Sequence, residues 1–313
     1  MAKSHQRDSS TSPRFAQPAT FMRLPHEVTP AGVDVAIVGV PFDSGTSYRS
    51  GARLGPREIR SQSSLIRPYS LFQKVSPFQI LRVVDAGDLD VPPAGSMEQA
   101  YQVIEAGVRR IVEAKAVPMI VGGDHSISLP CLRAVAATHG PLSLIQFDAH
   151  IDTWGDYFGG RYFHGSPFRR AIEEGLLRAG GYVQVGIRGP MYGEDEDFAF
   201  QHAHAVTMID IGQVKSAGIT ATIERIRRVV EGPVYVTFDI DSVDPAYAPG
   251  TGTPEVGGLT SYEAQELLRG LAGLNVVGCD VVEVAPTFDG PGQITALLAA
   301  NLMFELLCVI ARR

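Results

Sequence analysis

Short apolar segments rich in Val, Ile and Leu alternate with longer helical stretches along most of this 313-residue chain. Strands that are apolar along their whole length must be buried on both faces, which is typical of a parallel sheet covered by helices on each side. We therefore predict an α/β fold, a three-layer α-β-α sandwich around a mostly parallel sheet of about eight strands. The predicted strands are Val33–Val40, Ile80–Val84, Val117–Val121, Leu142–Phe147, Tyr182–Ile187, Ala205–Ile209, Val234–Phe238 and Val276–Val284.

Helices fit between these strands, and two of them begin with a capping-box pattern. Ser96 with Gln99 opens a helix predicted to reach Ala114, and Thr260 with Glu263 opens another that runs through Leu271. Two more helices are predicted over Thr220–Val230 and Ile294–Ile310.

Residues 1–30 are polar and lack periodicity, so we expect a loose N-terminal arm followed by a single domain over residues 31–313. The start of the chain shows no apolar segment of the kind found in signal peptides. The longest apolar stretch, near Ala296–Ile310, is interrupted by Asn301 and Glu305, which indicates a core helix rather than a membrane span.

Composition narrows the functional classes. An apolar share of 45% suffices for a large core, and a net charge of −7 argues against a nucleic-acid partner but suits a cationic substrate. The three cysteines, Cys131, Cys279 and Cys308, are far apart in apolar surroundings, and we interpret them as free thiols. We therefore expect a cytoplasmic protein that has neither a membrane nor a nucleic-acid partner.

Acidic and histidine side chains follow three of the predicted strands, at the edge where ligands bind in parallel sheets. Each pattern alone has a structural explanation, because Asp-x-Asp after a strand is usually a turn or a helix cap. Three such patterns in one sheet favour a shared site instead. The candidate residues are His125 after the third strand, Asp148, His150 and Asp152 after the fourth, and Asp239 and Asp241 after the seventh.

Spacing predicts that these groups converge. Asp148, His150 and Asp152 share one face while the chain stays extended, as do Asp239 and Asp241. Four crowded carboxylates would repel one another unless cations lay between them. Two divalent ions balance four aspartates, and oxygen-rich ligands with two neutral imidazoles favour Mn²⁺, with Ni²⁺, Co²⁺ or Zn²⁺ acceptable on ligand type.

Together the motifs resemble the ureohydrolase family, which contains arginase, agmatinase and the hydrolases of guanidinobutyrate and guanidinopropionate. The resemblance runs from about Val33 to the C-terminus and rests on Gly122-Gly-Asp-His-Ser126, Asp148-Ala-His-Ile-Asp152 and the segment Asp239–Pro254. It implies the arginase-like fold, two Mn²⁺ per subunit and a homo-oligomer, either trimer or hexamer. It also implies that a metal-bridging hydroxide cleaves a linear guanidino compound to urea and an amine.

The resemblance further implies a ligand set. One ion takes His125, Asp148, Asp152 and Asp239, and the other takes His150, Asp148, Asp239 and Asp241. The resemblance also implies three catalytic roles. Glu283 would hold the guanidinium by a bidentate ion pair, His164 would give a proton to the leaving amine, and Asp152 would orient the hydroxide.

The substrate tail is the open question. Arginases use an Asn just beyond the second motif to help bind an α-amino acid. This chain has Thr153-Trp-Gly-Asp-Tyr-Phe158 there and no such Asn, so arginine is disfavoured. Asp156 and the acidic segment Glu194–Asp197 lean toward agmatine, and Arg161 would favour a guanidino acid such as 4-guanidinobutyrate or 3-guanidinopropionate. The part of Tyr157 is not fixed by the sequence.

Other classes remain as alternatives. A related fold hosts zinc deacetylases with one metal, which would not need His125 together with all four aspartates. A guanidine hydrolase would act on free guanidine, and a catalytically silent regulatory subunit should have lost metal ligands. All six candidate ligand positions are filled here.

Overall fold

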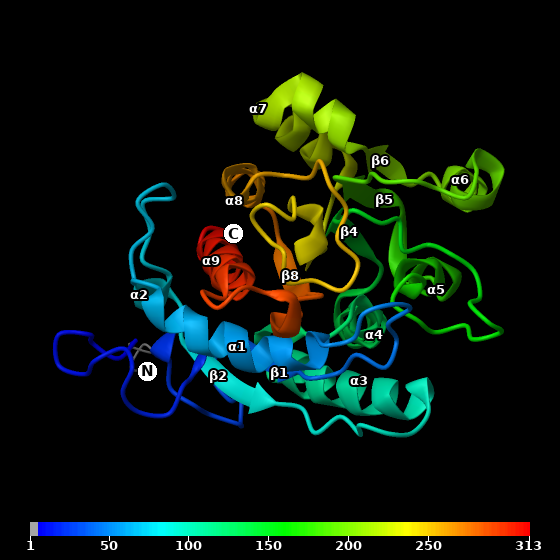
Figure 1. Ribbon diagram of the computed structural model, residues 1–313. Coiled ribbons are helices and arrows are strands. Elements are labelled where there is room, and N and C mark those ends of the chain that lie inside the picture. The colour runs from blue at the N-terminus through cyan, green and yellow to red at the C-terminus, as the bar shows by residue number, and fades with distance from the viewer. Residues whose placement is uncertain (1–5) are drawn as a thin grey trace.

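The computed structural model describes residues 6–313, with only the backbone described for residues 194–196. Within this part of the chain, one eight-stranded sheet is flanked by nine α-helices (Figure 1). The strands are β1 Val35–Val40, β2 Val83–Asp88, β3 Val117–Gly122, β4 Leu142–Phe147, β5 Leu177–Val185, β6 Thr207–Ile209, β7 Val234–Asp239 and β8 Val276–Val282. The helices are α1 Gly55–Gln62, α2 Pro77–Ile80, α3 Met97–Glu113, α4 Ser128–His139, α5 Pro167–Glu173, α6 Glu194–Ala203, α7 Ile211–Val229, α8 Ser261–Arg269 and α9 Ile294–Ile310.

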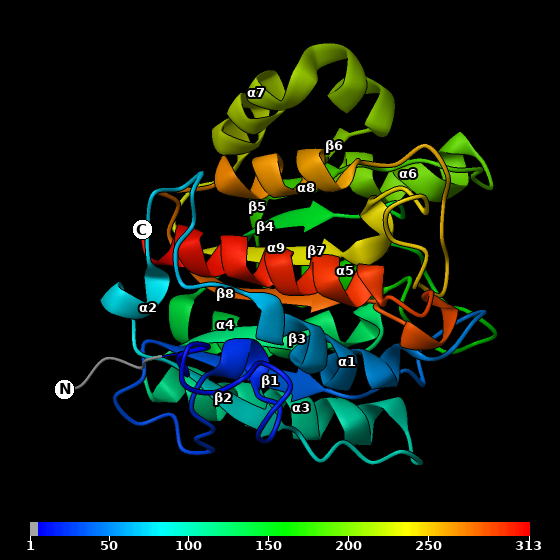
Figure 2. The ribbon, with the colours of Figure 1, turned by 60° about the vertical axis from the view of Figure 1, so that its left-hand side comes forward.

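The sheet separates two apolar cores, because successive side chains of a strand point to opposite faces. Along β1, Val35 and Ile37 join the core beneath α1, α7, α8 and α9, whereas Ala36 and Val38 join the core beneath α3, α4 and α5. Figures 1 and 2 show these two helical layers on either side of the strands. The predicted three-layer α-β-α sandwich is confirmed, and its strands pair in parallel throughout.

The strand order brings distant parts of the chain together. It runs β2-β1-β3-β8-β7-β4-β5-β6, so the last two strands of the sequence lie between β3 and β4. Because all strands are parallel, the carboxyl ends of β3, β8, β7 and β4 meet along one edge. Open α/β sheets bind their ligands at such an edge.

Some element boundaries differ from the sequence prediction. The strand predicted from Ile80 begins at Val83, because Pro77 opens a short helix that takes up Pro77–Ile80. Helix α4 was not predicted, since it is buried nearly all round and therefore lacks amphipathic periodicity. The acidic segment Glu194–Asp197 begins helix α6.

Part of the expected N-terminal arm belongs to the core. Residues 1–5 lie outside the described residues, but Phe21, Met22 and Leu24 are buried against the sheet. Two backbone amides hold this segment: Phe21 donates to the Asp85 carboxylate, and Met22 donates to the Ser63 hydroxyl. The burial of these three apolar residues was not predicted, because the sequence around them is polar and aperiodic. No helix of residues 6–313 is long and apolar enough to cross a bilayer.

Both predicted capping boxes are present, at Ser96 with Gln99 and at Thr260 with Glu263. Replacing Thr260 with Ala should lower the free energy of unfolding by about 1 kcal/mol, because the Glu263 amide loses its acceptor. The matched control is Thr220→Ala on the exposed side of α7, where a change within about 0.5 kcal/mol is expected. Urea unfolding followed by circular dichroism compares the two variants, and equal losses would contradict the capping role.

Candidate metal centre and substrate pocket

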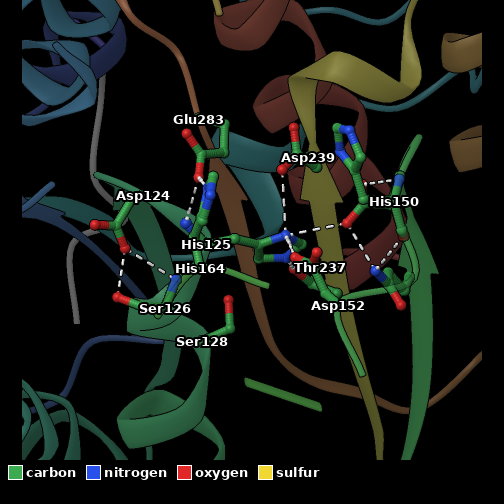
Figure 3. Close-up of polar contacts among 12 residues, drawn as sticks. Asp124, His125, Ser126, Ser128, His150, Asp152, His164, Thr237, Asp239 and Glu283 are labelled. Atoms are coloured by element: carbon green, nitrogen blue, oxygen red, sulfur yellow. Dashed lines mark hydrogen bonds and ion pairs between the residues drawn. The ribbon is translucent and has the colours of Figure 1, made fainter. Parts of the chain in front are cut away.

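The predicted site residues gather at the carboxyl ends of four adjacent strands (Figure 3). His125 opens a short 3-10 helix three residues beyond β3, and Asp239 is the last residue of β7. The Asp148–Asp152 segment follows β4, and Glu283 follows β8. The structure therefore brings the candidates from the three motifs and Glu283 into one buried region.

The first cluster surrounds one imidazole nitrogen. His125 Nδ1 lies 3.1 Å from Asp148 Oδ2, 2.9 Å from Asp152 Oδ2 and 3.2 Å from Asp239 Oδ2. All four side chains are almost completely buried. This is the same group of residues that the sequence analysis assigned to one ion.

The second cluster lies beside the first. His150 Nδ1 is 3.0 Å from Asp241 Oδ2 and 3.6 Å from Asp148 Oδ1. Asp148 thus directs one carboxylate oxygen to each imidazole, as a bridging ligand must. Asp239 lies close enough to Asp241 and Asp148 for their charges to act on it.

The predicted convergence occurs, but the expected reason for it is wrong. Neither segment continues as an extended strand: residues 240–242 turn into a 3-10 helix, and β4 ends at Phe147. Asp152 has a φ of +49°, a left-handed conformation that is uncommon outside glycine. Bends rather than strand alternation therefore direct Asp152 and Asp241 into the site.

A hydrogen-bond chain fixes the protonation of His125. Thr237 Oγ1 donates to the buried Asp280 carboxylate, so its lone pair is left to accept a hydrogen bond from His125 Nε2 at 2.8 Å. With the ring proton at Nε2, Nδ1 has no hydrogen-bond partner and presents its lone pair to three carboxylates. Lone pairs and anions repel, so a cation between them is the arrangement that satisfies this geometry.

Electrostatics support the same conclusion. Burial acts to lower the pKa of His125, but the carboxylates of Asp148, Asp152 and Asp239 outweigh it and hold this pKa well above its usual value. Burial, then repulsion from Asp241 and Asp148, raises the pKa of Asp239. The three carboxylates thus favour a positive charge next to His125 Nδ1, which a bound metal ion would supply. The donor set of six side chains fits two divalent cations.

Glu283 has one occupied and one free carboxylate oxygen. Its Oε1 accepts from the His125 amide at 2.9 Å and lies 2.9 Å from His164 Nδ1, whereas Oε2 is buried without a partner. The residue has a φ of +62°, so the backbone is strained at this position. A buried, unpartnered carboxylate oxygen beside the metal cluster is suited to accept an N–H from a cation.

His164 lies between Glu283 and the loop after β1. The Ser47 amide donates to His164 Nε2 at 3.1 Å, which requires a lone pair on that atom. Burial acts to lower the pKa of His164, but the Glu283 carboxylate outweighs it and raises the pKa to about 9. These opposing contacts let the ring both carry a proton and release it, as a proton donor must.

A cavity of about 500 Å³ opens above the two clusters. Asp156 and Tyr157, on which the sequence left the tail question open, both line it, whereas Arg161 is exposed and lies 3.2 Å from Glu173. The lining residues are Ser47, His150, Asp152, Trp154, Gly155, Asp156, Tyr157, Phe163, His164, Gly165, Tyr192, Asp239 and Thr253.

Trp154 forms one wall of this cavity, and a residue of α6 holds it in place. Trp154 Nε1 donates to the buried carboxylate of Asp197 at 2.7 Å, and Asp197 also accepts from the Gly193 amide. Tyr192 meets the Trp154 ring edge to face. The side chains of residues 194–196, the rest of the predicted acidic segment, lie outside the described residues.

Several residues that support the metal centre and the pocket were not predicted from the sequence. Asp280 was detectable as a lone charge within the buried strand β8, and Thr237 precedes Asp239 by two residues on the same strand face. Gln146 likewise precedes Asp148 and donates to its Oδ2 at 2.7 Å. The contact of Trp154 with Asp197 gave no signal, because it joins residues 43 positions apart in the sequence.

An all-parallel α/β sheet that gathers two imidazoles and four buried carboxylates at its carboxyl edge defines a binuclear metallohydrolase. Comparison with known proteins identifies the family. The model of the Arginase family matches residues 33–308, and the chain belongs to that family. It is therefore a ureohydrolase-type enzyme that acts on guanidino compounds, as its motifs predicted.

The relatives differ in their substrates. A guanidinopropionase and a guanidinobutyrase from Pseudomonas aeruginosa are 49% and 46% identical, covering 97% and 95% of this chain and 95% and 94% of their own. An agmatinase from Gallus gallus is 45% identical, covering 93% of this chain and 85% of its own.

Solved structures have the same fold. Proclavaminate amidinohydrolase from Streptomyces clavuligerus superposes with a TM-score of 0.91 at 44% identity, over 96% of this chain and 99% of its own. A formiminoglutamase from Trypanosoma cruzi, solved with Mn²⁺, gives 0.81 at 25% identity, over 90% and 94%.

The His125–Thr237–Asp280 chain gives a direct test of metal binding. Thr237→Val keeps the side-chain shape but removes the hydroxyl, so metal affinity should fall roughly 10- to 100-fold. Thr237→Ser retains the hydroxyl and should restore the affinity. Calorimetric titration of the metal-free protein with Mn²⁺ measures both, and equal affinities for the Val and Ser variants would contradict the proposed orientation of His125.

Proposed function

We propose that this enzyme hydrolyses a linear ω-guanidino acid to urea and the corresponding amino acid at a centre of two divalent metal ions. The observation that carries the proposal is the joint placement of His125 Nδ1, directed without a partner at three carboxylates, and Glu283 Oε2, buried without a partner beside them. The environment of His125 Nδ1 suits a resident metal cation, and Glu283 Oε2 suits the cationic guanidinium of a substrate.

His125, Asp148, Asp152 and Asp239 would hold one ion, and His150, Asp148, Asp239 and Asp241 the other. We infer Mn²⁺ as the native metal, because hard oxygen ligands outnumber the imidazoles, and the formiminoglutamase relative was solved with Mn²⁺. Ni²⁺, Co²⁺ and Zn²⁺ stay compatible with the ligand types. When bound, two such cations lower the pKa of a water molecule enough for it to act as a nucleophile near neutral pH.

The protein side chains supply orientation and proton transfer. Glu283 Oε2 would accept N–H groups of the guanidinium and hold its planar carbon toward the metal cluster. The carboxylate of Asp152 lies at the edge of the cavity, where it can orient the attacking water. Water adds to the guanidinium carbon, and the C–N bond to the tail breaks as His164 gives its proton to the departing amine. Of the two protons that the added oxygen loses as urea forms, one returns to His164 and the other leaves with the amine as an ammonium group.

The tail assignment rests on charge. The sequence leaned toward agmatine on account of Asp156 and the acidic segment of α6. In the structure, however, Asp197 is buried on Trp154, and Asp156 faces Arg170 at 3.7 Å. This weakens the case for an ammonium tail. The guanidinopropionase and guanidinobutyrase relatives support a carboxylate tail instead.

Hydroxyl donors can bind such a carboxylate, because Ser47, Tyr157 and Tyr192 line the cavity. Agmatine is the second candidate, since Asp156 also lines the cavity and carries the opposite charge. Arginine stays disfavoured: Thr153, at the position next to the motif, is buried and accepts a hydrogen bond from Gln201.

Assembly and location are also proposals. We propose a trimer or hexamer, which the large exposed side chains of Tyr69, Leu71 and Phe72 support because such groups often lie in subunit contacts. A cytoplasmic location is supported by the three cysteines, all buried and unpaired.

A substrate panel tests the proposed activity. The Mn²⁺-loaded enzyme is assayed for urea from 3-guanidinopropionate, 4-guanidinobutyrate, agmatine, arginine and guanidine, and the panel is repeated with Ni²⁺. We expect kcat/KM to be highest for one of the two guanidino acids. A higher kcat/KM for agmatine would overturn the tail assignment, and absence of urea from every compound would overturn the function.

The role of Glu283 is tested by Glu283→Gln, which keeps the shape and the contact with the His125 amide but removes the charge. Loss of a charge-assisted hydrogen bond costs about 1.5–3 kcal/mol, so kcat/KM should fall at least roughly 10- to 100-fold. Metal content should stay at the wild-type level. The control Glu231→Gln, on an exposed ion pair with Arg178, should leave kcat/KM unchanged. An unaltered kcat/KM for Glu283→Gln would remove Glu283 from the mechanism.

A further inference from the structure

A second cavity, of about 410 Å³, lies between the N-terminal segment and the residues around α2. Figures 1 and 2 both place α2 near the dark-blue N-terminal segment that begins at residue 6. Because α2 precedes β2, this cavity lies at the amino end of that strand, whereas the metal centre lies at the carboxyl ends. Its lining residues are Gln6, Arg7, Asp8, Ser9, Arg14, Arg23, Arg67, Pro68, Phe78 and Gln79.

The charge in this cavity is unbalanced. Four arginines line it, at positions 7, 14, 23 and 67, and they face a single carboxylate, Asp8. Among the described residues, none of these four guanidinium groups forms an ion pair within 4 Å. The half-buried Arg60 nearby is different, because it pairs with both Asp85 and Asp88.

Two of the guanidinium groups have unsatisfied donors. The Nε atoms of Arg14 and Arg23 are buried and lack hydrogen-bond partners. The whole side chain of Arg23 is deeply buried, because this residue is only 5% exposed. Burial, then repulsion from Arg14 and Arg7, lowers the pKa of Arg23. Leaving a buried charged donor without a partner is costly, so natural proteins usually compensate it with an opposite charge.

Two of the arginines are held in place by backbone carbonyls rather than by acids. Arg7 donates to the Pro18 carbonyl, and Arg23 donates to the Arg7 carbonyl. The Arg7 amide in turn donates to the Arg23 carbonyl at 3.1 Å, and Arg23 is held at a φ of +56°. The local fold therefore brings the positively charged side chains together, at the cost of backbone strain at Arg23. Such strain is often found at ligand-binding sites.

We propose that this cavity is a binding site for a small molecule that carries two or more negative charges on oxygen, from phosphate or carboxylate groups. Planar guanidinium forks match both kinds of group, and the free Nε donors of Arg14 and Arg23 supply hydrogen bonds. The volume exceeds that of a single ion and suits a metabolite. The site does not depend on the proposed hydrolytic activity.

Binding is tested on the Mn²⁺-loaded enzyme by calorimetry with fructose 1,6-bisphosphate and with succinate, which separate phosphate from carboxylate recognition. At least one probe should bind with one site per chain and weaken as salt is raised. In Arg14→Gln and Arg7→Gln, the dissociation constant should rise at least tenfold. Arg178→Gln and Arg228→Gln remove the same charge from exposed positions on other elements and should bind as the wild type does.

The variants also exclude a structural explanation. Arg14 and Arg7 are only partly buried, so their glutamine variants should fold and release urea at the wild-type rate without probe. Absence of saturable binding by both probes, or unchanged binding in both variants, would overturn the proposal. So would a loss of oligomer in Arg14→Gln on size-exclusion chromatography without any probe binding, which would assign the cavity to a neighbouring subunit's acidic residues.

Discussion

Repulsion among four buried aspartates is the constraint on which the site depends. All four carboxylates are buried, and among the described residues none of them forms an ion pair with a lysine or arginine. Their charges therefore need protons or metal ions for balance. The surrounding hydrogen bonds favour metal, because the Asp280–Thr237 pair leaves the Nδ1 lone pair of His125 facing the carboxylates. The carboxylate of Asp280, deep in β8, thus decides which ring nitrogen of His125 carries the proton, although His125 lies in the 3-10 helix that follows β3.

The sequence predicted the sheet well because burial on both faces leaves a plain apolar signal in each strand. It also predicted which residues meet, since parallel strands deliver their trailing residues to one edge. It could not predict how they meet. The left-handed turn at Asp152 and the 3-10 helix after Asp239 are local bends stabilised by tertiary contacts, and the amino-acid pattern resembles an extended segment.

Other features were hidden for related reasons. Helix α4 is buried nearly all round and so shows no periodicity, and the burial of Phe21 and Met22 depends on partners at Asp85 and Ser63, far along the chain. The contact of Trp154 with Asp197 likewise joins two segments across a loop. The contact that fixes Trp154 in the wall of the substrate pocket was therefore not predictable from the sequence, whereas the six candidate metal ligands were.

The insertion of β7 and β8 between β3 and β4 has a consequence for biosynthesis. A ribosome completes His125 and the Asp148–Asp152 segment well before Asp239, Asp241 and Glu283 exist, and the earlier strands have no direct edge in common. Neither cluster is complete until β7 and β8 have paired between β3 and β4. The proposed metal centre therefore gains its full set of ligands only in the last stage of sheet assembly, and a bound cation would then link strands made early with strands made late.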